Sequence, residues 1–105
     1  METTQSKWRN VRTTVDEFTF ASKREANRYA ELKIELLAGE IAELELQKTF
    51  SLDVNGVHIC DYIADFVYQR NGAQIVEDAK GKATDLFVVK KALMRAIHGI
   101  DVIEV

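Results

Sequence analysis

The chain of 105 residues has the size of one domain and can bury one hydrophobic core. Its single cysteine, Cys60, excludes an internal disulfide and a cysteine-rich zinc site, and no apolar run is long enough to span a bilayer, so we expect a cytoplasmic protein without a membrane partner. The net charge of −3 does not by itself indicate a nucleic-acid-binding protein, but residues 80–95 contain five basic residues and one acid, whereas residues 31–45 contain five acids and one basic residue.

The N-terminal residues are expected to lie outside the folded core. Residues 1–12 are mostly polar and more basic than acidic, which predicts a flexible basic arm. Residues 11–20 are compatible with a short hairpin around Asp16 and Glu17. This pair makes a poor two-residue turn, because type I′ turns need positive φ and neither residue adopts it as readily as Gly or Asn.

A helix is predicted for residues 22–38. Ser22 is suited to the N-cap position, and Glu25 follows three residues later, at the spacing of a capping box. Gly39 is placed to end the helix. Apolar residues recur on one side at a period of about 3.6 residues, and charged residues lie opposite. The apolar set is Ala26, Tyr29, Ala30, Leu32, Leu36 and Leu37, and the charged set is Arg24, Arg28, Glu31 and Glu35.

Strand and turn patterns follow, and then a second helix. Asn55-Gly56 and Asn71-Gly72 are strong type I′ hairpin turns. The predicted strands are 43–50, 51–54, 57–60, 62–69, 74–79 and 100–105. The second helix is predicted for residues 84–98, with Leu86, Val89, Leu93, Ala96 and Ile97 on one face. This order of elements predicts an α/β fold in which helices flank a mixed central sheet.

Two acids lie on the strands that the second turn joins. Side chains alternate between the faces of a strand. The expected faces are Ile63, Asp65 and Val67 on the first strand, and Val76, Asp78 and Lys80 on the second. Antiparallel pairing can bring Asp65 and Asp78 together, and such close carboxylates repel each other unless a cation lies between them. Oxygen ligands favour Mg²⁺ or Mn²⁺ at this position.

Lys80 adds a positive charge to the acidic pair. Its ammonium can hold an attacking water and offset charge that grows on a phosphate. Glu77 is an alternative to Asp78 as the ligand, but only Asp78 shares a face with Lys80, and a bulge in the strand would reverse this choice. The other interpretation of Asp65, Asp78 and Lys80 is a solvated hairpin with a cross-strand ion pair. The apolar flanks argue against it, because a charge embedded in a central strand is costly unless it has a function.

Glu25 is the third acid of interest. On the predicted helix it lies on the side that faces the sheet, where a carboxylate needs a partner. It either joins the metal cluster or closes the capping box with Ser22, and both roles remain open.

This pattern resembles the PD-(D/E)XK nuclease superfamily. The superfamily signature is an acid on one strand, D/E-x-K on the next and often a glutamate from the first helix, to which Asp65, Asp78-Ala79-Lys80 and Glu25 correspond. Ala64 stands where the superfamily name has a proline. Within the superfamily the chain is similar to a family of small, junction-resolvase-like phage and prophage endonucleases. The residues that match are Phe20, Ser22, Lys23, Glu25, Tyr29, Leu32, Gly39, Ile41, Leu44, Gln47, Phe50, Leu52, Tyr62, residues 64–66 and residues 76–81.

The resemblance implies a restriction-endonuclease-like αβββαβ core, with a single nuclease domain over residues 13–105. It implies hydrolysis of DNA phosphodiester bonds with Mg²⁺ or Mn²⁺ held by Asp65, Asp78, the Ala79 carbonyl group and Glu25. It also suggests that Gln47 points into the site, although a surface glutamine is the alternative. The residues expected to contact the DNA backbone are Lys82, Lys90, Lys91, Arg95, Lys23 and Arg24.

The resemblance also suggests an oligomeric state, a DNA substrate and a biological process. The resemblance implies a homodimer that cuts branched or junction DNA, because two symmetric cuts need two sites. It implies action in phage recombination, repair or packaging in the cytoplasm of a bacterial host cell, with other phage replication or recombination proteins as further partners. The alternative is a catalytically silent DNA-binding or scaffold module on the same fold.

Overall fold

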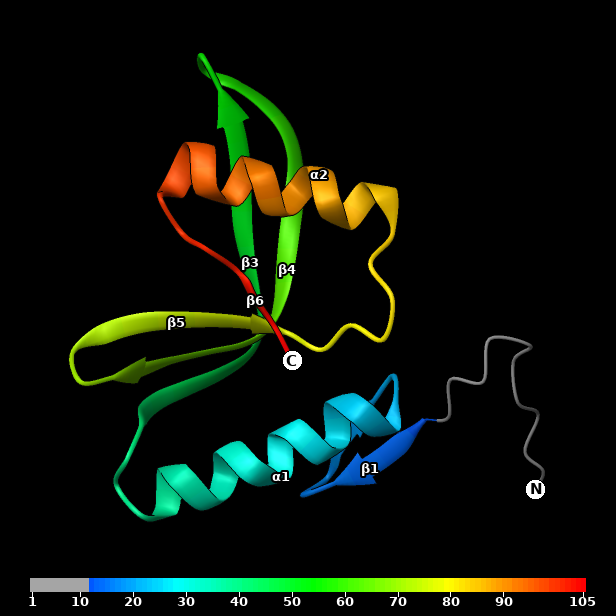
Figure 1. The fold of residues 1–105 in the computed structure, drawn as a ribbon, viewed down its shortest axis with the longest axis vertical. Helices are drawn as coiled ribbons and strands as arrows, with labels where there is room; N and C mark the ends of the chain where they lie inside the picture. The colour runs from blue at the N-terminus through cyan, green and yellow to red at the C-terminus, as the bar shows by residue number, and fades with distance from the viewer. Residues whose placement is uncertain (1–11) are drawn as a thin grey trace.

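The computed structural model describes residues 12–105, so the arm predicted for residues 1–12 lies outside the described residues except for Arg12. This part of the chain forms a four-stranded mixed sheet, a two-stranded hairpin and two helices (Figure 1). The predicted α/β class with a mixed sheet is therefore confirmed. No helix within residues 12–105 has the length and apolar character needed to cross a bilayer.

The elements follow the predicted order, but the predicted strands 43–50 and 51–54 form one strand, as do 57–60 and 62–69, and the last strand is shorter than the predicted 100–105. They are β1 (Thr13–Val15), β2 (Phe18–Phe20), α1 (Lys23–Leu37), β3 (Ala42–Val54), β4 (Val57–Arg70), β5 (Ala73–Asp78), α2 (Asp85–Leu93), the π-helical turn η1 (Met94–His98) and β6 (Ile103–Glu104). The strand order in the large sheet is β3-β4-β5-β6, with β6 parallel to β5 and the other pairs antiparallel. Asn55 and Asn71 have φ of 52° and 53°, as the predicted type I′ turns require.

Each helix covers a different part of the long β3–β4 hairpin (Figure 1). Phe87 of α2 packs in one hydrophobic cluster with Leu52 of β3 and Tyr62 of β4. Leu32 of α1 packs in a second cluster with Phe66, farther along β4. The β3–β4 hairpin therefore contributes to both hydrophobic clusters. The residues of β3 and β4 between the two clusters lie where one cluster gives way to the other.

The side-chain alternation of β4 changes at this junction. Ala64 packs in the α2 cluster, whereas Phe66, two residues later, packs in the α1 cluster, and Val67 returns to the α2 cluster. The expectation that Ile63, Asp65 and Val67 share one face is wrong, because Ile63 is exposed and Val67 is buried. The change coincides with Gln47, the residue of β3 opposite Asp65, whose φ of 54° interrupts the extended backbone.

The start of α1 agrees with the capping pattern, and the hairpin before it departs from the turn rules. The Ser22 hydroxyl accepts a hydrogen bond of 3.2 Å from the Glu25 backbone N–H group, as expected of an N-cap. Asp16 and Glu17 both have positive φ, at 52° and 69°, although neither favours it. A tertiary contact holds the turn, since the Tyr29 hydroxyl donates to Asp16 at 3.0 Å.

The buried face of α2 differs from the prediction. Leu86 and Val89 were expected to face the core, but they are 63% and 54% exposed, whereas Phe87 and Met94 are buried. All four residues 86–89 are apolar, so the sequence period does not define one face there. The π-helical turn that begins at Met94 also departs from the regular helix period.

Candidate active site

Asp65 and Asp78 lie side by side on neighbouring strands. The register of β4 and β5 pairs Phe66 with Glu77, and the next step along both strands places Asp65 opposite Asp78. Asp65 accepts a hydrogen bond of 2.9 Å from the backbone N–H group of Ala79. Asp78 accepts one of 2.5 Å from the Tyr62 hydroxyl. Both carboxylates are therefore held in place by donors from the sheet itself.

Gln47 connects this pair to α1. Its Nε2 group donates to Glu25 at 3.0 Å and to Asp65 at 3.1 Å, so one amide bridges two acids from different layers. Glu25 is buried in the first turn of α1, where its backbone N–H group also serves the Ser22 cap. The Ser22 cap and the position of Glu25 beside Gln47 are thus compatible, and the structure brings Glu25, Gln47 and Asp65 together, with Gln47 itself exposed to solvent.

Lys80 lies on the Asp78 side of the pair. Its ammonium is 3.5 Å from Asp78 Oδ1 and 4.9 Å from the centroid of the Phe87 ring. The side chain is 33% exposed, so its charge is accessible from solvent and still close to the buried Asp78. This placement agrees with the predicted shared face of Asp78 and Lys80.

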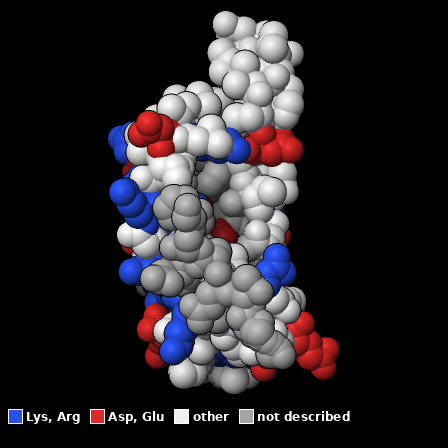
Figure 2. Space-filling model, turned by 90° about the vertical axis from the view of Figure 1, so that its right-hand side faces the viewer, with Lys and Arg blue, Asp and Glu red and all other residues white. Residues whose placement is uncertain are grey.

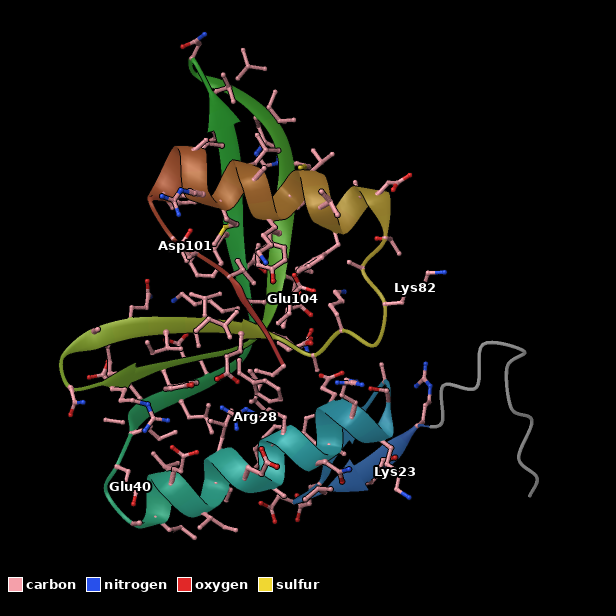
Figure 3. All side chains as sticks on the ribbon, in the orientation of Figure 1. Lys23, Arg28, Glu40, Lys82, Asp101 and Glu104 are labelled. Atoms are coloured by element: carbon pink, nitrogen blue, oxygen red, sulfur yellow. The ribbon has the colours of Figure 1, made fainter. Side chains whose placement is uncertain are left out.

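Glu77 is directed toward α1 and is not part of the cluster. It receives two hydrogen bonds from Arg28, at 2.8 Å from Nε and 2.7 Å from Nη2, and a third from the Tyr68 hydroxyl. Figure 3 places Arg28 between α1 and the sheet. Arg28 was expected on the solvent side of its helix, and that expectation is wrong, because its side chain reaches a carboxylate that is 2% exposed. Asp78, and not Glu77, is therefore the acid of β5 that lies beside Asp65 and Lys80.

The packing shifts the proton affinity of two acids. Burial, followed by the closeness of Asp78, raises the pKa of Asp65 to about 7. Burial also raises the pKa of Glu25 above its usual value, and a backbone interaction with Ala21 offsets part of this effect. Both carboxylates therefore lie in surroundings that favour a proton or a cation.

The free energy of unfolding should respond to the Asp65 proton in a chelator-treated sample. The folded-state pKa of about 7 lies above the ordinary 3.8, so Asp65 stabilises the fold fully below about pH 4. This contribution is lost as the pH rises through 7, since the folded state must then lose its proton too. Relative to Asp65→Asn, the wild-type protein should become less stable between pH 4 and pH 7 in urea unfolding with EDTA. Glu40→Gln, at an exposed acid, is the control, and a pH profile that Asp65→Asn leaves unchanged would contradict the assignment.

The donor set fits a hard divalent cation held by two carboxylates. Asp65 and Asp78 offer oxygen ligands, and the Ala79 carbonyl group lies next to Asp78 in the chain, which suits Mg²⁺ with several retained waters. Within residues 12–105, no three His, Cys, Asp or Glu side chains form a ready-made metal cage. The Gln47 amide lies between Glu25 and Asp65, so Glu25 completes the set only through water or after this amide moves.

The predicted DNA-contacting residues fall into two groups. Lys23 and Lys82 are exposed and project from the right-hand side of the molecule in Figure 3. Figure 2 views that side and shows acidic atoms recessed in a hollow between basic side chains. The others have partners or are partly buried: Lys91 is paired with Glu104, Arg95 with Asp101, Arg24 donates to the Val105 carbonyl group, and Lys90 shares a pocket with Lys80.

Sequence reasoning missed Tyr62 and the Arg28–Glu77–Tyr68 cluster. Tyr62 lies three residues before Asp65, but its hydrogen bond crosses to Asp78 on the neighbouring strand. The only sequence signal for the cluster is the glutamate next to Asp78 in an otherwise apolar strand, which needs a buried partner.

Comparison with known proteins places the chain in a family. No curated protein and no solved structure matches it. The model of the family described as "Protein of unknown function (DUF1064)" matches residues 5–99, which is most of the chain. The chain therefore belongs to the DUF1064 family.

Proposed function

We propose that this protein is a Mg²⁺-dependent endonuclease that hydrolyses DNA phosphodiester bonds. One observation carries the proposal: Asp65 and Asp78 lie opposite each other on adjacent strands, with Lys80 beside one and Glu25 bridged to the other through Gln47. An acidic pair with one buried and one half-buried member and a nearby ammonium is costly for a fold and matches the needs of phosphoryl transfer.

The order of elements supports a restriction-endonuclease-like core. After the β1–β2 hairpin the chain runs α1, β3, β4, β5, α2 and β6, which is the αβββαβ order of PD-(D/E)XK nucleases. Glu25, Asp65 and Asp78-Ala79-Lys80 stand on α1, on β4 and at the end of β5, the elements that carry the signature in that superfamily. This correspondence of position is independent of the side-chain contacts.

The residues divide the chemical work. Asp65, Asp78 and the Ala79 carbonyl group would hold the cation, which supplies a more acidic bound water and polarises the phosphoryl group. Tyr62 fixes the orientation of the Asp78 carboxylate, and Ala79 N–H fixes that of Asp65. Lys80 positions the attacking water and offsets the charge that develops on the phosphate. Gln47 keeps Glu25 and Asp65 at a constant separation.

Branched DNA is the proposed substrate, and a homodimer the proposed active form. A chain of this size carries one cluster of this kind within residues 12–105, and two symmetric cuts across a junction need two clusters. Lys23 and Lys82 lie on the face with the acidic hollow and would contact the DNA backbone.

Cleavage of three DNA forms tests the proposal. The wild-type protein should cut a labelled four-way junction with Mg²⁺, with paired cuts in opposite strands, and should cut nothing with EDTA. Single-stranded DNA and linear duplex are the comparison substrates, and Asp78→Asn is the control for a contaminating nuclease. DNA binding without Mg²⁺-dependent cleavage of any substrate would replace the proposal with a silent binding module, and one cut per junction would contradict the dimer.

A further inference from the structure

Each member of the acidic pair lines a pocket of its own. One, the hairpin pocket, has a volume of about 450 Å³ and is lined by Arg12, residues 18–21, Leu46, Glu25, Gln47 and Asp65. The other, the lysine pocket, has a volume of about 230 Å³, and its lining includes Asp78, Lys80 and Lys90. Because Asp65 borders the first pocket and Asp78 the second, a strand held at the pair extends into both.

The two pockets differ in chemistry. The lysine pocket is lined by the ammonium groups of Lys80 and Lys90 and by the carboxylates of Asp61 and Asp78, so with the proposed cation at Asp78 it suits the phosphates of a DNA strand. The hairpin pocket has two phenylalanine rings and Leu46, together with the guanidinium group of Arg12 and the carboxylates of Glu25 and Asp65. A phosphate gains little there, whereas a flat, largely apolar group with a polar edge fits it. Its volume lies within the range of sites for small organic ligands, about 300–1,000 Å³.

Phe18 presents an aromatic face to this pocket. Its side chain is 48% exposed, and it is the one phenylalanine or tyrosine in residues 12–105 that is exposed to this extent. The ring is braced from behind, because its centroid is 5.8 Å from that of Tyr29 in an edge-on contact and 6.4 Å from that of Phe20. A braced ring that is half exposed and lines a pocket can serve as a stacking platform for a nucleic-acid base.

The turn that carries Phe18 is conformationally costly. Asp16 and Glu17 both adopt positive φ without glycine, in a hairpin whose strands have three residues each. Such strain persists where surrounding contacts enforce it, and it is concentrated at functional sites. Here the contact from the Tyr29 hydroxyl to Asp16 enforces it and sets the position of Phe18.

We infer that the hairpin pocket takes one unpaired base of the strand that is cut, stacked on Phe18, while the lysine pocket holds the neighbouring phosphates. The inference rests on the proposed nuclease function and names its substrate class: DNA with an unstacked nucleotide next to the scissile bond. A paired base enters such a pocket only after unpairing and unstacking, whereas a base at a junction, flap or single strand is already free.

Oligonucleotide binding with a fluorescent base tests this. The probe is a single DNA strand that contains one 2-aminopurine, and the same strand in a duplex is the comparison. The parent protein is the Lys80→Met variant in Mg²⁺, so that the probe is not cut during the measurement. Stacking on Phe18 should quench the 2-aminopurine on binding. Phe18→Ala should remove the quenching and weaken single-strand binding about tenfold, within the range for loss of one base–aromatic stack, while duplex binding stays unchanged.

Three further variants complete the test. Phe18→Leu keeps an apolar side chain against Tyr29 and lacks the aromatic face. It should therefore also lose quenching and single-strand affinity, and this loss cannot be attributed to poor folding. Phe18→Tyr should restore quenching and affinity. Ile34→Ala, at an exposed apolar residue of α1 that is not among the pocket residues, should change neither.

The outcomes separate this inference from the nuclease proposal. Equal single-strand affinity in the parent, Phe18→Ala and Phe18→Leu proteins would overturn the base pocket, as would Mg²⁺-dependent cutting of paired duplex that Phe18→Ala leaves unchanged. A further outcome is quenching that depends on Phe18 while the wild-type protein, which keeps Lys80, cuts no DNA with Mg²⁺. That combination would overturn the nuclease proposal and would still support the base pocket.

Discussion

Replacing Arg28 with methionine should lower the free energy of unfolding by about 3–5 kcal/mol, the range for removing one partner of a buried ion pair. Arg28 makes two hydrogen bonds, of 2.8 and 2.7 Å, to Glu77, which is 2% exposed. Methionine keeps an aliphatic stem, so the loss comes mainly from a carboxylate left in the core with the Tyr68 hydroxyl as its remaining side-chain donor. Urea unfolding at neutral pH measures the effect.

Lys91→Met is the matched control. Lys91 and Glu104 have the same nitrogen–oxygen separation of 2.7 Å, but both side chains are 40% exposed, so this pair should contribute less than about 1 kcal/mol. The double variant Arg28→Met with Glu77→Met should regain part of the loss, because no charge then stays buried. A loss in Arg28→Met no larger than that in Lys91→Met would show that the pair does not hold α1 to β5.

The same pair explains why the site keeps its shape. Glu77 is the neighbour of Asp78 in β5, and Arg28 is one helical turn beyond Glu25 in α1. The pair therefore ties the helix that carries one acid to the strand that carries another, on the side of the sheet away from Lys80. Weakening it should disturb the separation of Glu25 from the Asp65–Asp78 pair before it unfolds the sheet.

The acidic pair was predictable because a turn sets its register. A two-residue turn at Asn71-Gly72 makes Arg70 and Ala73 partners, and counting back along both strands reaches Asp65 and Asp78 together. No tertiary information enters this count. Ser22 at the N-cap of α1 is a similar case, since the capping hydrogen bond spans only three residues.

Features that depend on packing between layers were not predictable. The change in the buried face of β4 at Asp65 lies beside Gln47, which has positive φ. Neither a glycine nor a turn sequence at Gln47 indicates this backbone conformation. Arg28 was assigned to solvent by helical period, but a long side chain at the edge of the buried face can reach a strand. The buried face of α2 was ambiguous because residues 86–89 are all apolar, and contact with Leu52 and Tyr62 selects Phe87.

Replacing Lys80 with methionine should lower the rate of Mg²⁺-dependent DNA cleavage by at least about 100-fold, the usual cost of losing one group that stabilises transition-state charge. The ammonium is 3.5 Å from Asp78, at the opening of the lysine pocket. Methionine keeps the length of the stem and loses only the contact of the ammonium with the Phe87 ring and a partly exposed ion pair, so the melting temperature should change by only a few degrees. Single-turnover cleavage of the four-way junction with saturating protein measures the rate without the contribution of binding.

Lys82→Met separates catalysis from electrostatic attraction. Lys82 follows Lys80 by two residues, is exposed, and projects outward from the loop before α2 (Figure 3). If Lys82 contacts the DNA backbone as proposed, its loss should weaken binding and lower the salt dependence, while the single-turnover rate at saturation stays near that of the wild type. Equal rate losses in both variants would show that Lys80 acts only as one of several surface charges. A fully active Lys80→Met protein would show that the Lys80 ammonium has no part in the mechanism. A loss confined to Lys80 would point to the ammonium itself, which lies 3.5 Å from Asp78, where it would position the attacking water and offset the charge that develops on the phosphate.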